Sequence, residues 1–395
     1  MRMDKKEKTT APVSSAPTDA ELSSVQSTTE SITDKHFEIK EKQAVSATPD
    51  PSSGKYTKMS RDPRHLNTMT MKELYDSVYQ SRPSVIGDLL YPGTYLFVGA
   101  PKLGKSFLML EFAYHVATGT DLWEYPVRKG TVLYLALEDE NRRLQDRLYR
   151  MFGMDCTENL YLGVEASQLH EGLLDQLENF VREHPDTELI IIDTLQKIRE
   201  IGDDRYSYAN DYEVITRLKE FTDRKDICLL LVHHTRKQQA DDKFEMISGT
   251  NGLMGAADGA FLLHKDKRTS CEAVLEVSGR DQPDQTLYLN RNAETLVWDL
   301  EKAEAESFVP KAEPVLEALA AFITVNYPDW CGRASELVDI LKLDMNPNTL
   351  TMKLNINASR LLNEYGIRYE NKRNHDGRQV LFHLEPEEAS RERNG

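Results

Sequence analysis

Short, unbroken apolar runs recur through the middle of the chain, and segments with helical periodicity follow most of them. The runs predict strands at 93–98, 131–137, 189–193 and 227–233, and the periodic segments predict helices at 107–117, 140–152 and 207–222. Strands without polar alternation are typical of parallel sheets, because helices cover both faces of such sheets. The pattern therefore predicts an α/β domain built on a mostly parallel sheet.

The spacing of the apolar positions changes after Gly259. Close-set short runs predict strands at 260–264, 273–277, 286–290 and 295–298. Short connections favour antiparallel pairing, so we expect these strands to extend the same sheet as an antiparallel section. The highly charged stretch 301–313 that follows is interpreted as a linker.

A compact unit is predicted beyond this linker. Apolar periodicity indicates helices at 314–325, 335–341 and 347–365, with Asn346 as the N-cap of the third helix and Gly366 as its C-terminal cap. Two strands follow, at 367–370 and 379–384, and the Asp376–Gly377 pair between them is a hairpin signal. Three helices and a hairpin are the outline of a small winged-helix domain.

The start of the chain has a different composition. Residues 1–62 are rich in Ser, Thr, Lys, Glu, Ala and Pro and nearly free of aromatic residues, so they cannot bury enough apolar area to offset the entropy of ordering. We interpret them as a disordered N-terminal tail. Order is expected to begin with a helix near Thr70, because Thr70 and Glu73 have the spacing of a capping box.

Charge and composition exclude several classes of protein. No apolar run approaches the roughly 20 residues of a membrane span, and no signal peptide is visible, so we expect a cytoplasmic protein without a membrane partner. The four cysteines are scattered without a CxxC pair, which argues against a zinc site or a disulfide framework. The net charge of −16 means that any nucleic-acid site must be local.

The turn after the first predicted strand carries the most specific signal in the sequence. It fits G-x-x-x-x-G-K-[ST] at every fixed position, with a strand before it and a helix after it. Backbone N–H groups of such a turn surround phosphates at the helix N-terminus, Lys105 reaches the β- and γ-phosphates, and the Ser106 hydroxyl ligates Mg²⁺. The predicted cofactors are ATP and Mg²⁺, and the predicted nucleotide-binding residues are Gly99, Ala100, Pro101, Lys102, Leu103, Gly104, Lys105 and Ser106.

An acidic side chain is expected beside this turn. Asp193 ends the apolar run at 189–193, and ligands of open α/β sheets bind at the carboxyl ends of the strands. We therefore predict that Asp193 holds Mg²⁺ through water.

The sequence predicts three regions: a disordered tail at 1–62, an ATPase domain at 63–304, and a linker with the winged helix at 305–395.

With these motifs in order, the segment from about Pro83 to Trp298 resembles the RecA-like ATPases of the hexameric replicative helicase type, especially the plasmid RepA-type and DnaB-type helicases. The resemblance implies that Glu138 polarises the attacking water, with Glu140 as the rival base. It also implies that His234 senses the γ-phosphate and that Arg280 is an arginine finger for the neighbouring subunit's nucleotide. An arginine acting in trans requires self-assembly, here a homo-oligomeric ring and in this family a hexamer.

The resemblance also points to DNA. Loops after the Asp193 and His234 strands face the central channel of such rings, and here they carry basic and aromatic residues suited to single-stranded DNA: Lys197, Arg199, Arg205, Tyr206, Tyr208, Arg236, Lys237 and Lys243. The winged-helix candidate offers a second, duplex-binding surface, or alternatively a protein contact. Its polar and basic residues are Thr349, Thr351, Lys353, Asn355, Arg360, Lys372, Arg373, His375 and Arg378.

Three functions remain open from the sequence. The leading one is an ATP-driven DNA helicase or translocase in the replication of a plasmid or mobile element. The alternative is an ATP-gated DNA-binding or regulatory factor that does not unwind, and Ser278, at a position where DnaB-type helicases usually carry lysine, leaves unwinding open. The third is a KaiC-like signalling ATPase without a DNA role.

Overall fold

The computed structural model describes residues 66, 68–79, 83–199, 207–234, 251–267, 269–280, 282–305, 312–374 and 377–385. Several residues of the expected DNA loops lie outside this part, namely Arg205, Tyr206, Arg236, Lys237 and Lys243, as do His375 and the tail at 1–62. Residues 69–395 form one compact unit. No helix among the described residues is long and apolar enough to cross a bilayer.

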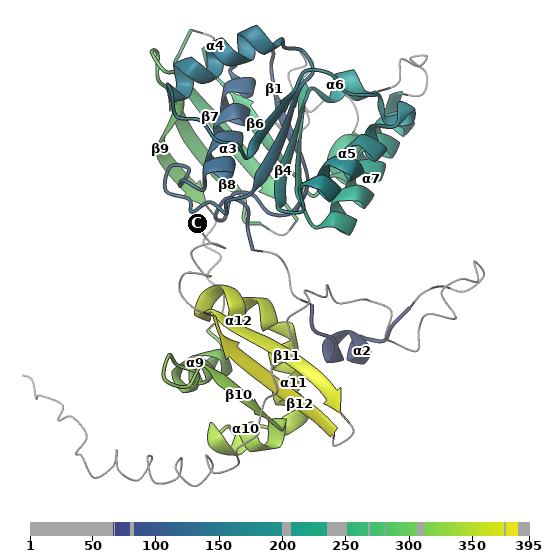
Figure 1. Cartoon of the computed structure of the whole chain (residues 1–395), viewed down its shortest axis with the longest axis vertical. Coiled ribbons are helices and arrows are strands. Elements are labelled where there is room, and N and C mark those ends of the chain that lie inside the picture. Colours follow the sequence, from purple (N-terminus) through teal and green to yellow (C-terminus); the bar gives the residue numbers. More distant parts are fainter. Residues whose placement is uncertain are drawn as a thin grey trace, which may run out of the picture. The chain divides into compact units, whose positions relative to one another are not determined.

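A mixed sheet forms the centre of the α/β domain (Figure 1). Its strand order is β3-β2-β4-β5-β1-β6-β7-β8-β9, parallel from β3 to β6 and antiparallel from β6 to β9. The strands are β1 (Gly93–Gly99), β2 (Thr131–Ala136), β3 (Leu160–Gly163), β4 (Thr187–Asp193), β5 (Cys228–His234), β6 (Gly259–His264), β7 (Glu272–Gly279), β8 (Gln285–Arg291) and β9 (Trp298–Ala305). The expected α/β architecture with a parallel core is confirmed.

Two expectations for the second half of the sheet were wrong. The strand at 260–264 was expected in the antiparallel section, but β6 pairs in parallel with β1, and its buried apolar centre fits a position inside the sheet. The last strand was expected to end at Trp298 and to lead into a linker. Instead β9 begins at Trp298, and Leu300 and Ala303 pack against the core while charged neighbours face solvent. A register shift in its pairing with β8 breaks the alternation, so the charges hid the strand.

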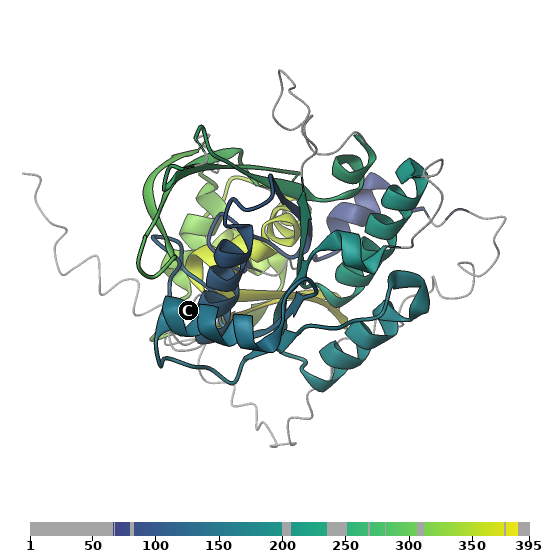
Figure 2. The same cartoon turned by 90° about the horizontal axis from the view of Figure 1, so that it is seen from above.

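Helices cover both faces of the sheet, as Figures 1 and 2 show. Alternate residues of β1 enter different cores: Phe97 packs with α3 (Lys105–Thr118) and α4 (Asn141–Phe152), whereas Leu96 and Val98 pack with the opposite layer. That layer contains α5 (Leu173–Glu183), α6 (Leu195–Ile198), α7 (Ser207–Lys225) and α8 (Asn251–Ala256). The sequence did not predict α5 or the short edge strand β3.

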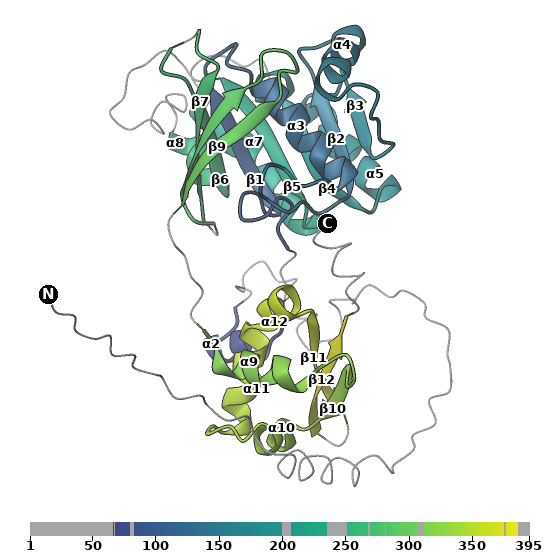
Figure 3. The same ribbon diagram turned by 90° about the vertical axis from the view of Figure 1, so that its left-hand side faces the viewer.

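The C-terminal unit has helices on one side of a three-stranded sheet (Figure 3). Its elements are α9 (Pro314–Phe322), β10 (Asp329–Gly332), α10 (Ala334–Ile340), α11 (Pro347–Ile356), α12 (Ala358–Tyr365), β11 (Ile367–Asn374) and β12 (Gly377–Leu384). The Asn346 cap is confirmed by its bond from the Thr349 amide, at 2.8 Å, and the Gly366 cap by its left-handed backbone.

Three details of this unit differ from expectation. The helix expected at 347–365 is two helices, because the chain breaks at Asn357, whose amide side chain donates to the Lys353 carbonyl at 2.8 Å. The first helix ends at Phe322, short of residue 325. The strand β10 was missed, since four residues with only one buried position carry little periodic signal.

The helix predicted after Thr70 forms as α2 (Met71–Asp76), with both bonds of the capping box present. It contacts α11 of the C-terminal unit. The Asn355 side chain, which is 1% exposed, donates to the Tyr75 carbonyl at 2.9 Å and accepts from the Tyr369 hydroxyl at 2.9 Å. A hydrogen-bonded buried amide therefore joins α2, α11 and β11.

Candidate nucleotide site

The phosphate-binding turn runs from the end of β1 to the start of α3. Gly104 has φ of 103°, which places the first amides of α3 around the turn. A side chain at Gly104 would meet the Trp298 ring at 2.9 Å, and one at Gly99 would meet the Leu263 carbonyl at 2.5 Å. Close packing therefore requires both glycines, and the left-handed backbone of Gly104 is a second reason for glycine at that position.

Lys105 is 4% exposed and bonded to its own loop. Its Nζ donates to the carbonyls of Gly99 (2.7 Å) and Ala100 (3.0 Å) and lies 2.9 Å from His234 Nδ1. Burial lowers the pKa of Lys105 to about 8, although the negative charges of Asp193 and Glu138 oppose this shift. A phosphate entering the loop would supply the stronger partner that this ammonium group lacks.

Asp193 and Ser106 meet at the carboxyl edge of the sheet. The Ser106 hydroxyl donates to Asp193 Oδ2 at 2.7 Å, and the buried Tyr134 hydroxyl donates to the same oxygen at 3.0 Å. Burial raises the pKa of Asp193, while these two hydrogen bonds and Lys105 act in the opposite direction.

This pair fits Mg²⁺, which prefers oxygen ligands and is commonly bound through one or two protein groups together with phosphates. No cluster of three or more His, Cys, Asp or Glu side chains suited to a metal occurs among the described residues. In this site the hydroxyl of Ser106 would hold the ion, and the carboxylate of Asp193 would hold it through water.

Glu138 follows β2 and faces the same edge. Its carboxylate accepts from the Thr194 hydroxyl at 3.2 Å and lies 3.9 Å from His234 Nε2. Glu140, the rival base, is 69% exposed and has its nearest charged partner, Arg143, at 3.9 Å. The intervening Asp139 is held by Arg143 at 3.0 Å and by Arg147 at 2.8 Å. Of these three carboxylates, only Glu138 is in contact with the other site residues.

His234 ends β5, the strand between β1 and β4. Burial lowers the pKa of its imidazole, and the charge of Lys105 lowers it further. The neutral ring can accept from Lys105 through Nδ1 and present its Nε2 hydrogen toward Glu138. His234 thus lies between the lysine of the loop and the candidate base.

Arg280 is the one predicted catalytic residue that the structure places away from this edge. It follows β7, whose last residue, Gly279, pairs with Gly259 at the start of β6. Gly259 in turn is level with Tyr95, near the start of β1, whereas Gly99 is level with Leu263. Arg280 therefore lies at the amino edge of the sheet. A length of strand of roughly 13 Å separates this edge from the phosphate loop.

Sequence reasoning missed several side chains that shape the site. Tyr134 lies inside an apolar strand, where a hydroxyl gives no periodic signal, yet it bonds to Asp193. Trp298, at the start of β9, packs close to Gly104 of the loop although it is distant in the sequence. Glu111 on α3 is 1% exposed and accepts from the Trp298 amide at 2.9 Å, and burial raises its pKa to about 8.

Few of the basic residues proposed for DNA contact in the two loops after the Asp193 and His234 strands belong to the described part of the chain. Lys197 is exposed on α6, directly after the Asp193 strand, and Arg199 follows as a half-buried side chain. The remaining basic residues of the two loops lie outside the described part, so this prediction stays open.

Residues 61–240 match a family model described as an AAA domain. A comparison with curated proteins finds no match.

Three solved structures are similar. One is described as an ATPase domain (16% identity, 53% of this chain and 85% of that chain, TM-score 0.45). A DnaB-like replicative helicase studied with primase has 16% identity over 57% of this chain and 66% of that chain, with a TM-score of 0.46. A KaiC-like protein of Pyrococcus horikoshii has 12% identity over 57% of this chain and 99% of that chain, with a TM-score of 0.41.

Proposed function

We propose that this protein, a RecA-like P-loop ATPase with an AAA domain over residues 61–240, is a ring-forming motor that couples ATP hydrolysis to movement along single-stranded DNA. The observation that carries the proposal is the separation of two half-sites in one chain. Lys105, Ser106, Glu138, Asp193 and His234 gather at the carboxyl edge of the sheet, while Arg280 is exposed at the opposite edge. Replication of a plasmid or mobile element is the biological role that the sequence resemblance adds.

Each residue at the carboxyl edge has a place in the proposed chemistry. The amides at the start of α3 and Lys105 bind the phosphates, and Ser106 with Asp193 holds Mg²⁺, which neutralises phosphate charge when bound. Glu138 accepts a proton from the attacking water, because its carboxylate is partly exposed at this edge of the sheet and can act as a general base. His234 contacts Lys105 in the nucleotide-free protein. A γ-phosphate that binds Lys105 takes the place of His234, and this exchange is how His234 senses the nucleotide.

The position of Arg280 is the reason for proposing a ring. An arginine at the amino edge is too far from the phosphates of its own chain, so an arginine finger at this position would act on a nucleotide bound by another copy. A head-to-tail contact brings the amino edge of one copy to the carboxyl edge of the next, and a closed series of such contacts is a ring. We propose a homo-oligomeric ring, a hexamer as in the resembled family, with Arg280 completing the site in trans.

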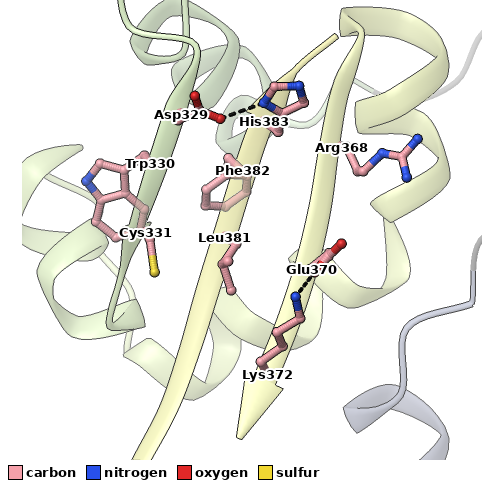
Figure 4. A pocket seen from close by; sticks show the side chains of 9 residues that line it. All are labelled: Asp329, Trp330, Cys331, Arg368, Glu370, Lys372, Leu381, Phe382 and His383. Carbon is pink, nitrogen blue, oxygen red and sulfur yellow. Dashed lines mark hydrogen bonds and ion pairs between the residues drawn. The ribbon is translucent and has the colours of Figure 1, made fainter. Parts of the chain in front are cut away.

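For the C-terminal unit we propose a protein contact in preference to duplex DNA. Its described basic side chains are largely neutralised within the chain: Lys353 by Glu313 (2.6 Å), Arg360 by Glu364 (2.6 Å) and Arg378 by Asp76 (3.2 Å). Figure 4 shows two further pairs on the outer face of the small sheet, Lys372 with Glu370 and His383 with Asp329. A duplex-binding surface requires cations that are free to contact phosphates.

These pairs also weigh against the alternative of an ATP-gated factor that binds duplex DNA through a winged helix. That alternative predicts specific duplex binding without strand displacement. A signalling ATPase, in contrast, predicts hydrolysis that is indifferent to DNA.

The deciding experiment measures ATP hydrolysis with and without single-stranded DNA for wild type, Lys105→Ala and Arg280→Ala. The motor predicts stimulation by DNA, loss in both variants, and recovery when the two inactive chains are mixed, because each supplies the half-site that the other lacks. Hydrolysis unaffected by DNA would overturn the proposal.

A further inference from the structure

The guanidinium of Arg280 is held by neighbours that the proposed function does not yet use. Its Nη2 donates to the Gly255 carbonyl at 2.8 Å, and its Nη1 lies 3.9 Å from Asp258 Oδ1. The backbone N–H of Arg280 also donates to the Asp258 carbonyl at 2.8 Å. The side chain nevertheless remains 54% exposed, so one side of the guanidinium is anchored and the other is open.

Asp258 is itself fixed from two further elements. Its carboxylate accepts from the Thr94 amide of β1 at 3.0 Å and from Lys219 Nζ of α7 at 2.5 and 2.6 Å. Gly93 makes room for it, because a side chain at that position would lie 2.9 Å from Asp258 Oδ2. The Asp258 carboxylate is only 14% exposed, and its two oxygens meet donors from β1 and α7.

The charges in this group leave Arg280 available to an anion. Lys219 is close to both oxygens of Asp258 and also contacts Asp223 at 3.1 Å, so it neutralises much of the aspartate charge. Arg280 lies at 3.9 Å from Asp258, too far for a strong hydrogen-bonded ion pair. The aspartate therefore orients the arginine without cancelling its charge.

We propose that Asp258, held by Lys219, is the positioning residue for Arg280 and aims this arginine at the nucleotide of the neighbouring copy. This inference rests on the proposed function. It adds a specific coupling, because the anchor is built from α7 and α8, the helices that follow the two loops expected to meet DNA. The anchor of Arg280 therefore includes Lys219 of α7, through Asp258, and Gly255 of α8.

The test uses the full chain and compares Asp258→Asn with Asp223→Asn. Asparagine keeps an oxygen for the Thr94 amide but removes the charge that orients Lys219 and Arg280. Asp223→Asn removes the other carboxylate of Lys219, which is 56% exposed and, among the described residues, is not an ion-pair partner of Arg280. Lys219→Gln provides a second route to the same effect if Asp258→Asn does not fold.

We expect Asp258→Asn to lower DNA-stimulated kcat by about 10- to 100-fold, because a misplacement of about 1 Å can cost 100-fold in rate. The KM for ATP should stay within about threefold, since the phosphate loop of the same chain is untouched. Asp223→Asn should retain wild-type activity.

Two further measurements separate positioning from general stability. The double variant Asp258→Asn with Arg280→Ala should be no slower than Arg280→Ala alone, because both changes remove the same contribution. Mixing the Asp258→Asn chain with Lys105→Ala should restore activity, whereas mixing it with Arg280→Ala should not.

The outcomes distinguish this inference from the proposed function. If Arg280→Ala is inactive but Asp258→Asn and Lys219→Gln are fully active, the positioning role is overturned and the shared site stands. Multiplicative losses in the double variant would also overturn it, since they would indicate a structural role. If Arg280→Ala keeps full DNA-stimulated activity, the shared site itself fails, and positioning fails with it.

Discussion

The Ser106 hydroxyl donates to Asp193 Oδ2 at 2.7 Å, although the two residues belong to segments 87 positions apart in the chain. The contact exists because the phosphate-binding turn leads from the end of β1 to the start of α3, while β4 ends at the same edge of the sheet. Both side chains offer oxygen atoms to one point beside the phosphate loop. The proposed Mg²⁺ site is thus formed by the sheet order, before any nucleotide contact is considered.

Tyr134→Phe should weaken the response to Mg²⁺. The Tyr134 hydroxyl orients Asp193 Oδ2, and loss of an outer hydrogen bond to a metal ligand typically costs about 10- to 100-fold in metal affinity. We expect the Mg²⁺ concentration for half-maximal ATP hydrolysis to rise by about tenfold, with Tyr149→Phe, an exposed tyrosine, as the control. An unchanged Mg²⁺ dependence would show that Tyr134 only fills space.

Glu138→Gln should separate hydrolysis from binding. Loss of a general base typically costs about 10²- to 10⁴-fold in rate, whereas the phosphate loop and its affinity for ATP stay intact. Single-turnover hydrolysis and equilibrium ATP binding measure the two effects. Glu140→Gln is the matched control, because Glu140 is 69% exposed and makes no hydrogen bond as the N-cap of α4. Greater loss in Glu140→Gln would reverse the assignment.

Nucleotide affinity should fall at alkaline pH through Lys105. Its pKa is lowered to about 8 in the nucleotide-free protein, and phosphate contact favours the charged form, so binding above pH 8 requires uptake of a proton. The ATP dissociation constant should rise by up to about tenfold per pH unit above pH 8. Calorimetry in buffers of different ionisation enthalpy counts the protons, and Lys105→Ala should bind weakly with no such uptake. A flat profile for wild type would contradict the prediction.

Glu111→Gln should stabilise the protein at neutral and alkaline pH. Burial raises the pKa of Glu111 from an ordinary 4.5 to about 8, so between these values the folded state binds the extra proton. The free energy of unfolding therefore falls as pH rises through this window, by at most about 1.4 kcal/mol per pH unit. Glutamine keeps an acceptor for the Trp298 amide without titrating. Urea unfolding at pH 5 and pH 8 should show a gain only at pH 8, and equal gains would exclude this cause.

The site was predictable where chemistry and local sequence coincide. The strand, the turn at 99–106 and the helix follow one another directly in the sequence, so the motif and its context are both visible there. The capping groups Thr70 and Asn346 likewise act on residues only three positions away. Asp193 and Glu138 could be assigned to one edge because strands that pair in parallel end together. The contact of His234 with Lys105 needed the order of the strands, which places β5 beside β1.

The sequence by itself determined the elements and the phosphate loop, since apolar periodicity and turn chemistry act between close neighbours. Tertiary structure decided the parallel pairing of β6, the edge strand β9 and the break at Asn357, where packing and distant hydrogen bonds override the local pattern. It also decided the hydroxyl of Tyr134 on Asp193 and the placement of Arg280 at the far edge. Those relationships join positions that are distant in the chain, and only the folded sheet brings them within bonding distance or keeps them apart.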